Sequence, residues 1–83
     1  MSMPKHRLLR VEWEDSASRG KWHRTTEIGR RATLQCESVG YVVRSDKHEI
    51  VLAQSICENE DINDTMAIPR GCIRKVRRLQ GKP

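Results

Sequence analysis

The chain contains no phenylalanine, and its only aromatic residues are two tryptophans and one tyrosine among 83 residues. Hydrophobic residues make up 36% of the sequence, so the chain is able to build only one small core. We therefore expect a single domain over residues 1–83. Because a shared buried face adds core that one copy of a small chain lacks, a homo-oligomer is also expected.

The sequence also lacks a long apolar run. No stretch approaches the roughly 20 apolar residues of a membrane-spanning helix, and residues 1–10 have no apolar segment of the kind found in a signal peptide. The three cysteines, Cys36, Cys57 and Cys72, are widely spaced and form no Cys-x-x-Cys pair, which argues against a zinc site. These absences predict a protein of the reducing cytoplasm whose thiols are buried or idle, with no membrane partner.

Recognisable catalytic patterns are missing as well. The sequence has no Gly-rich phosphate loop, and no Cys–His or Ser–His pair stands in a familiar context. The acidic segment at residues 58–64 lacks the spacing, the glycine and the terminal glutamate of an EF-hand. We expect no enzyme, no catalytic residue, no metal and no cofactor. The acids of this segment are instead candidates for contact with a basic strand of another copy.

Alternating hydrophobicity predicts the first strand. Leu9, Val11 and Trp13 alternate with charged residues, which indicates a half-buried strand with Trp13 on its core face. A small polar loop follows at residues 15–20, and residues 21–31 are predicted to be irregular with a short strand or helical turn.

The second half of the chain predicts the remaining strands. Residues 32–44 are predicted to be a long strand, with Gly40 marking a bulge or a sharp bend. A hairpin loop at residues 45–48 leads to a strand over residues 49–56. After the acidic loop, apolar character resumes at residues 66–68, and a tight turn follows at residues 69–71. The spacing of the last apolar residues fits a final strand, with a short helix as the alternative.

This order of elements predicts a mostly β fold. It fits a single small five-stranded barrel of SH3-like or Sm-like type, with one short helical turn before the last strand. Closure of a barrel removes the exposed strand edges on which sheets aggregate.

Several segments carry a resemblance to known proteins. Residues 11–16, residues 38–43 with 50–53, and residues 68–73 are similar to segments of uncharacterised small proteins encoded by bacteriophages and prophages. The similarity covers nearly the whole chain and implies an SH3-like barrel, a phage origin and a location in the bacterial host cell. It implies no catalytic or ligand-binding residue.

The charge balance favours anionic partners. Sixteen Lys and Arg against eleven Asp and Glu give a net charge of +5. Trp22 stands beside Lys21, His23 and Arg24, with Arg19 just before, and such a set is able to stack on a base while its cations hold phosphate. The alternative is that Trp22 covers one end of the barrel as core. Tyr41 follows Gly40, and its ring is expected to pack while its hydroxyl reaches a wet site.

The last segment is the most basic part of the sequence. It carries Arg70, Arg74, Lys75, Arg77, Arg78 and Lys82 with no acid between them. Arginine suits phosphate through its two-pronged guanidinium. In a strand, Arg74 and Arg78 project to one face, and Lys75 and Arg77 to the other. The alternative is a solvated basic edge that prevents association between sheets.

These features predict a small non-enzymatic phage-type binding module. Its expected partner is nucleic acid or a nucleotide, bound at a basic face with stacking aromatic residues. Two alternatives stay open: an adaptor or inhibitor that binds a host protein, and an oligomer that traps a signalling nucleotide in anti-defence. The predicted binding residues are Arg19, Lys21, Trp22, His23, Arg24, Tyr41, Arg70, Arg74 and Arg78.

Overall fold

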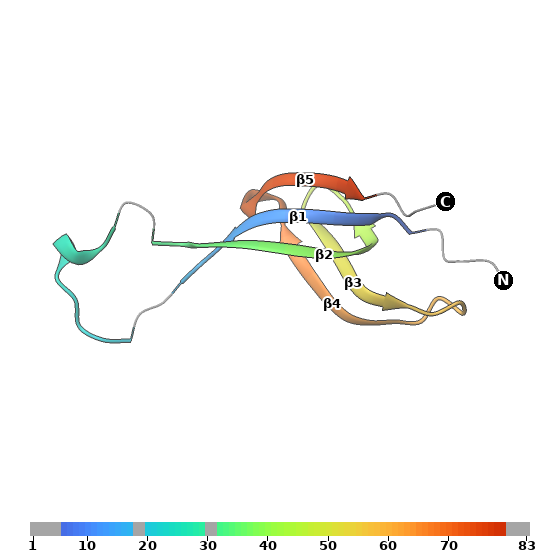
Figure 1. The fold of residues 1–83 in the computed structure, drawn as a ribbon, viewed down its shortest axis with the longest axis horizontal. Coiled ribbons are helices and arrows are strands. Elements are labelled where there is room, and N and C mark those ends of the chain that lie inside the picture. The colour runs from blue at the N-terminus through green and yellow to red at the C-terminus, as the bar shows by residue number, and fades with distance from the viewer. Residues whose placement is uncertain (1–5, 18–19, 30–31, 80–83) are drawn as a thin grey trace.

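The protein folds as one antiparallel sheet of five strands, and the computed structural model describes residues 6–17, 20–29 and 32–79. The sheet has the spatial order β4-β3-β2-β1-β5 (Figure 1). Its strands are β1 (Leu8–Asp15), β2 (Leu34–Ser45), β3 (Glu49–Ile56), β4 (Ile62–Pro69) and β5 (Ile73–Leu79). The prediction of a mostly β fold with five strands is confirmed. The predicted closure into a barrel is not seen: the sheet is open, because β4 and β5 form its two edges and do not pair with each other in the described residues.

The core lies on one face of the sheet and follows from the alternation in the sequence. Leu9 and Val11 of β1 are buried together with Ile50, Leu52 and Ile68. Complete burial of a Val or Ile side chain contributes about 1.5–3 kcal/mol, so these few residues provide most of the apolar stabilisation.

Trp13 continues the same face of β1. It packs against the core, and its Nε1 donates a hydrogen bond to Ser38 Oγ at 3.0 Å. The prediction that Trp13 belongs to the core is therefore confirmed, with its one polar atom paired at the edge of that core.

Of the two features predicted at Gly40, a bulge or a sharp bend, the bulge is not formed. The pairing of β1 with β2 runs through Gly40 without a shift, and the irregularity between β2 and β3 falls between Val42 and Arg44. A Cβ atom at Gly40 would lie 2.9 Å from the carbonyl oxygen of Ala53, which is closer than Cβ atoms approach oxygen. Glycine is needed here because β2 and β3 come close together, so a side chain would force them apart.

The acidic loop predicted at residues 58–64 is shorter than expected. β4 already begins at Ile62, which pairs with Ile56 of β3. The turn is closed by a hydrogen bond from the Cys57 amide to the Asp61 carbonyl (2.8 Å), and Glu60 takes a positive φ of 73° within it. Residues 62–64 therefore belong to a strand, because cross-strand pairing with Ile56 outweighs their polar character.

Two single turns of 3-10 helix complete the described chain. The first, η1 (Thr25–Glu27), lies between β1 and β2 and takes the place of the short strand considered for residues 21–31. The second, η2 (Arg70–Cys72), is the predicted helical turn before the last strand. β5 after it is a strand and not a helix, since it pairs with β1 from Leu79 to Ile73.

Candidate functional site

The connection between β1 and β2 projects away from the sheet as an arm, which we define as residues 16–33. Figure 1 shows it extending from the sheet, far from β5, with η1 near its end. The molecule is 58 Å long but only 25 Å and 21 Å across. Every described residue of the arm is exposed to solvent. The arm is therefore presented to solvent as a separate surface and adds nothing to the core.

The outer part of the arm displays an aromatic ring among cations. Trp22 has a relative exposure of 102%, so its indole touches essentially nothing else in the protein. This excludes the alternative in which Trp22 covers the core. Lys21 and Arg24 flank it, are exposed, and make no ion pair with any described residue. The geometry leaves both faces of the indole free for a flat partner, with positive charge on either side.

Local hydrogen bonds shape this end of the arm. The amide of Glu27 donates to the Arg24 carbonyl at 3.0 Å, and the amide of Ile28 donates to the Thr25 carbonyl at 3.3 Å. His23 lies 3.4 Å from the Glu27 carboxylate, at the i,i+4 spacing across the turn. These bonds fold the chain into one helical turn just after Trp22. The only acid of the arm is thereby held beside His23.

The arm also carries most of the net charge of the protein. It contains one acid, Glu27, and five Lys or Arg residues, so it accounts for +4 of the total of +5. Residues 1–15 hold three bases and three acids, and residues 34–79 hold seven of each. The sheet is thus nearly neutral and the arm strongly basic. The five cations are Arg19, Lys21, Arg24, Arg30 and Arg31; of these, Arg19, Arg30 and Arg31 lie outside the described residues.

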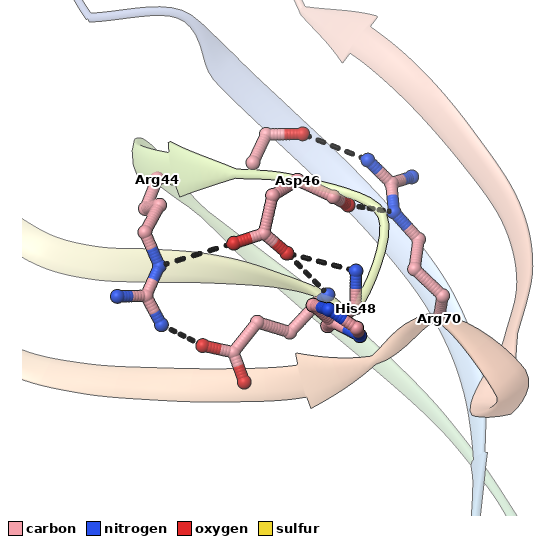
Figure 2. Close-up of polar contacts among 6 residues, drawn as sticks. Arg44, Asp46, His48 and Arg70 are labelled. Carbon is pink, nitrogen blue, oxygen red and sulfur yellow. Dashed lines mark hydrogen bonds and ion pairs between the residues drawn. The ribbon is translucent and has the colours of Figure 1, made fainter.

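Arg70, one of the predicted anion-binding residues, has a structural role. Its Nε donates to the Asp46 carbonyl and its Nη2 to Ser45 Oγ, both at 2.8 Å (Figure 2). The backbone amide of Arg70 also donates to the His48 carbonyl at 2.9 Å. Arg70 therefore fastens η2 to the turn between β2 and β3, and much of its donor capacity is already used.

The turn that Arg70 contacts is itself closely bonded. Asp46 Oδ1 accepts hydrogen bonds from the amides of His48 (2.8 Å) and Glu49 (3.0 Å). Arg44 forms ion pairs with the carboxylates of Asp46 and Glu49 (Figure 2). This arrangement is a side-chain-supported turn of the kind that Asp favours. Arg44 and Arg70 both contact this turn, but the partners of their guanidinium groups are carboxylates, a hydroxyl and a carbonyl of the protein itself.

Arg74 is also engaged within the chain. Its guanidinium lies 2.9 Å from Glu14 Oε1 and donates to the Gly71 carbonyl at 2.9 Å. The register between β1 and β5 shifts between Glu12 and Trp13, which leaves Arg74 opposite no residue of β1. Arg78, by contrast, pairs with Leu9, so β1 engages Arg74 and Arg78 in different ways.

The remaining residues of the predicted set, and the basic neighbours Lys75 and Arg77 outside that set, lie on the sheet. Lys75 and Arg77 pair with Glu12 and Arg10, and they share a face as predicted. Lys75, Arg77 and Arg78 are exposed and form no ion pair among the described residues. Tyr41 is half-buried in β2, opposite Leu8 and Ala53. Tyr41, Arg70, Arg74 and Arg78 are therefore separate from the arm, and the predicted set is divided between two places.

His6 makes a tertiary contact that the sequence did not indicate. Its Nδ1 lies 2.9 Å from the Val42 carbonyl and its Nε2 lies 2.9 Å from Glu60 Oε1. The hydrogen bond to Glu60, together with that to Val42, raises the pKa of His6 above its ordinary value. Both partners are acceptors, so only the doubly protonated imidazolium is able to donate to both. Sequence spacing gives no sign of a contact between residues 54 positions apart.

Surface hollows and groups of possible metal ligands give no stronger candidate site than the arm. A shallow hollow of about 200 Å³ lies beside β2, β3 and β4, with Ser38, Leu52, Asp64 and Met66 in its lining. It contains no cation. Within the described residues, no three His, Cys, Asp or Glu side chains lie close enough to hold a metal ion. The arm, with its exposed indole and its cations, is therefore the strongest candidate for a binding surface.

Comparisons with known proteins add no further constraint. No family model matches the chain, and neither a curated protein nor a solved structure is significantly similar to it. Among the described residues, no helix has the length and apolar character needed to cross a membrane. The resemblance to phage proteins stays a prediction.

Proposed function

We propose that the protein is a non-enzymatic binding module that takes up nucleic acid with its arm. The observation that carries this proposal is the fully exposed Trp22 between Lys21 and Arg24, on a segment holding +4 of the net charge. Burial of Trp is normally favourable, so a fully exposed indole on a projecting segment suits a partner that covers it. Bases stack on indole rings regardless of sequence, and the neighbouring cations neutralise phosphates.

Single-stranded nucleic acid fits this surface better than a free nucleotide does. An unpaired base offers its flat face to Trp22, while the backbone on either side reaches several cations of the arm. A free nucleotide needs an enclosed pocket with convergent polar groups. The hollow beside β4 is shallow and lined by Asp64 with no cation, so it opposes a phosphate.

Assignment to the SH3-like class and to phage proteins belongs to the same proposal. The strand order, the long β1–β2 connection and the single 3-10 turn before β5 support the SH3-like assignment, whereas the phage assignment depends on the sequence resemblance alone. Fold class alone does not identify a ligand. The proposal therefore depends on the arm.

Fluorescence anisotropy with a labelled oligonucleotide tests this function. The Trp22→Ala variant is expected to bind about tenfold or more weakly, since stacking on an aromatic residue contributes about 1–3 kcal/mol per base. The double variant Lys21→Ala, Arg24→Ala is expected to reduce the slope of log affinity against log salt by about 1.4, because each phosphate contact contributes about 0.7 on single strands.

A matched control separates the arm from net charge. Arg7, just before β1, and Lys47, in the turn between β2 and β3, are exposed and make no ion pair among the described residues. Replacing both by Ala removes the same number of charges. This control variant should keep the wild-type salt slope. The proposal would be contradicted if the control variant lost as much salt slope as Lys21→Ala, Arg24→Ala. It would also be contradicted if Trp22→Ala bound the oligonucleotide with wild-type affinity. Capture of a protein partner from nuclease-treated lysate that depends on Trp22 would point to the adaptor hypothesis instead.

A further inference from the structure

The two edges of the sheet are the part of the molecule that the proposed function does not use. β4 pairs only with β3, and β5 pairs only with β1. In the described residues, no other strand covers the outer backbone groups of either edge. An uncovered edge is a template for pairing with another strand.

The two edges carry opposite charge. Residues 48–69, which include β3 and β4, hold five acids and no Lys or Arg. Residues 70–79, which include β5, hold five Lys or Arg and no acid. β4 and β5 stand at opposite ends of the strand order. The β5 edge is therefore positive, whereas the negative charge of the β4 side lies on Asp64 and on the turn just before β4, which holds Glu58, Glu60 and Asp61.

Several of these charges are available to a partner. On the basic edge, Lys75, Arg77 and Arg78 are exposed and form no ion pair among the described residues. On the acidic edge, Glu58 and Asp64 are likewise exposed with no cation beside them in that part of the chain. The other acids differ: Glu49 pairs with Arg44, Glu60 bonds to His6, and Asp61 accepts a hydrogen bond from Asn59.

Apolar side chains lie beside these charges. Ile62 and Met66 of β4 are 43% and 44% exposed, and Val76 of β5 is 42% exposed. Ile68 is the only buried residue of β4. Exposed edges are usually protected by Lys, by Pro or by a covering segment. From Ile62 to Ala67, β4 has none of these and a single charge, Asp64, so it is the less protected edge.

We propose that a second copy of the chain docks its basic β5 edge on the acidic β4 edge of the first. Unlike charges then face each other, and Val76 comes against the apolar side chains of β4. Pairing of two β5 edges would place like charges together, which is unfavourable. Each docked pair keeps one free edge of each sign, so the contact is heterologous and leads to a ring or a short open chain. The arm takes no part in it.

Sedimentation velocity of the whole chain tests this inference. At about 50 mM salt we expect a mass at least twice the 9.6 kDa of one copy, falling toward one copy at about 500 mM, because screening weakens contacts between exposed charges. A single copy of 9.6 kDa at low salt and high protein concentration would overturn the proposal.

Charge exchange makes the test specific. One variant carries Lys75→Glu, Arg77→Glu and Arg78→Glu on β5, and the other carries Glu58→Lys, Asp61→Lys and Asp64→Asn on the β4 side. Asn is chosen at Asp64 because the residue has a positive φ of 50°, which Asn tolerates. Each variant alone should be a single copy. Their equimolar mixture should associate again, because every edge then meets one of opposite sign.

The mixture also guards against misfolding, since unfolded variants would not restore association. Association that persists in either variant alone, or a mixture that stays as single copies while both variants retain the wild-type circular dichroism spectrum, would refute edge docking. The arm variant Lys21→Ala, Arg24→Ala should associate like the wild type. Its loss of association would refute edge docking and point to the arm, whereas failure of nucleic acid binding alone leaves edge docking intact.

Discussion

Arg70 illustrates how a residue of anion-binding type is used inside the fold. Its guanidinium donates to the Asp46 carbonyl and to Ser45 Oγ, and it ties η2 to the β2–β3 turn. Its neighbour in the basic segment, Arg78, makes no such bond among the described residues. The same residue type thus has two roles within nine positions of the sequence. The difference arises from position in the fold, because Arg70 lies beside the acceptors of the β2–β3 turn.

Replacement of Arg70 by Ala is expected to lower the free energy of unfolding by about 1 kcal/mol. A typical internal hydrogen bond contributes about 0.5–1.5 kcal/mol, and the two side-chain hydrogen bonds of Arg70 are each weakened by exposure to solvent. Urea unfolding followed by circular dichroism measures the change. Arg78→Ala is the matched control, and it should change stability by less than about 0.5 kcal/mol. Equal losses in the two variants would contradict the structural role of Arg70.

At the scale of elements, His6 links the segment before β1 to two others. It contacts the Val42 carbonyl in β2 and the Glu60 carboxylate in the β3–β4 turn. The amide of Val42 also donates to the Arg7 carbonyl at 2.8 Å, so the segment before β1 is held to β2 beside the bulge. These contacts hold residues 6 and 7 near the acidic turn.

The contact of His6 predicts a pH dependence of stability. Its raised pKa means that the folded state binds the proton more tightly than the unfolded state. The stabilisation is therefore fully present below the unfolded value of about 6.5 and is lost as the pH rises through the folded pKa. The melting temperature of the wild type should exceed that of His6→Gln at pH of about 5.5, and the difference should shrink by pH of about 8.5.

His48→Gln is the control for this experiment. Its backbone forms the β2–β3 turn, but its side chain is exposed and makes no hydrogen bond among the described residues. The His48 variant should follow the wild type at every pH. A difference between wild type and His6→Gln that stays constant or grows as the pH rises would contradict protonation of the His6 contact.

At the scale of the whole molecule, the arm and the sheet are independent parts. No described residue of the arm is buried. At the base of the arm, Thr33 donates a hydrogen bond to the Glu14 carboxylate of β1. The core residues all come from β1, β3 and β4. Stability therefore belongs to the sheet, and most of the net charge belongs to the arm.

Replacing residues 16–33 by Asn-Gly is expected to leave a folded sheet. The pairing of Asp15 with Leu34 brings the two strand ends together, and Asn-Gly is the favoured two-residue hairpin loop. The free energy of unfolding should stay the same or rise slightly, because a shorter loop costs less entropy to close. The net charge falls from +5 to +1, and oligonucleotide binding should be lost. Unfolding of this shortened chain would show that the arm contributes to the core.

The amino-acid sequence by itself determined the strands and most of the core. Alternation placed Leu9, Val11 and Trp13 on one face, and residues 49–56 were predicted with the limits they have in the structure. Such local patterns suffice because a strand with one buried face has a period of two, whatever surrounds it.

Tertiary structure alone decided which charges are free. Arg70 and Arg74 look the same as Arg78 in the sequence, but acceptors on distant strands engage the first two. Trp22 was open to two interpretations until the arm was seen to project from the sheet. The contact of His6 with Glu60 and the opposite charge of the two edges depend on strand order, which pairs residues far apart in the chain. Local periodicity cannot encode that order, because it arises from how the strands pack together.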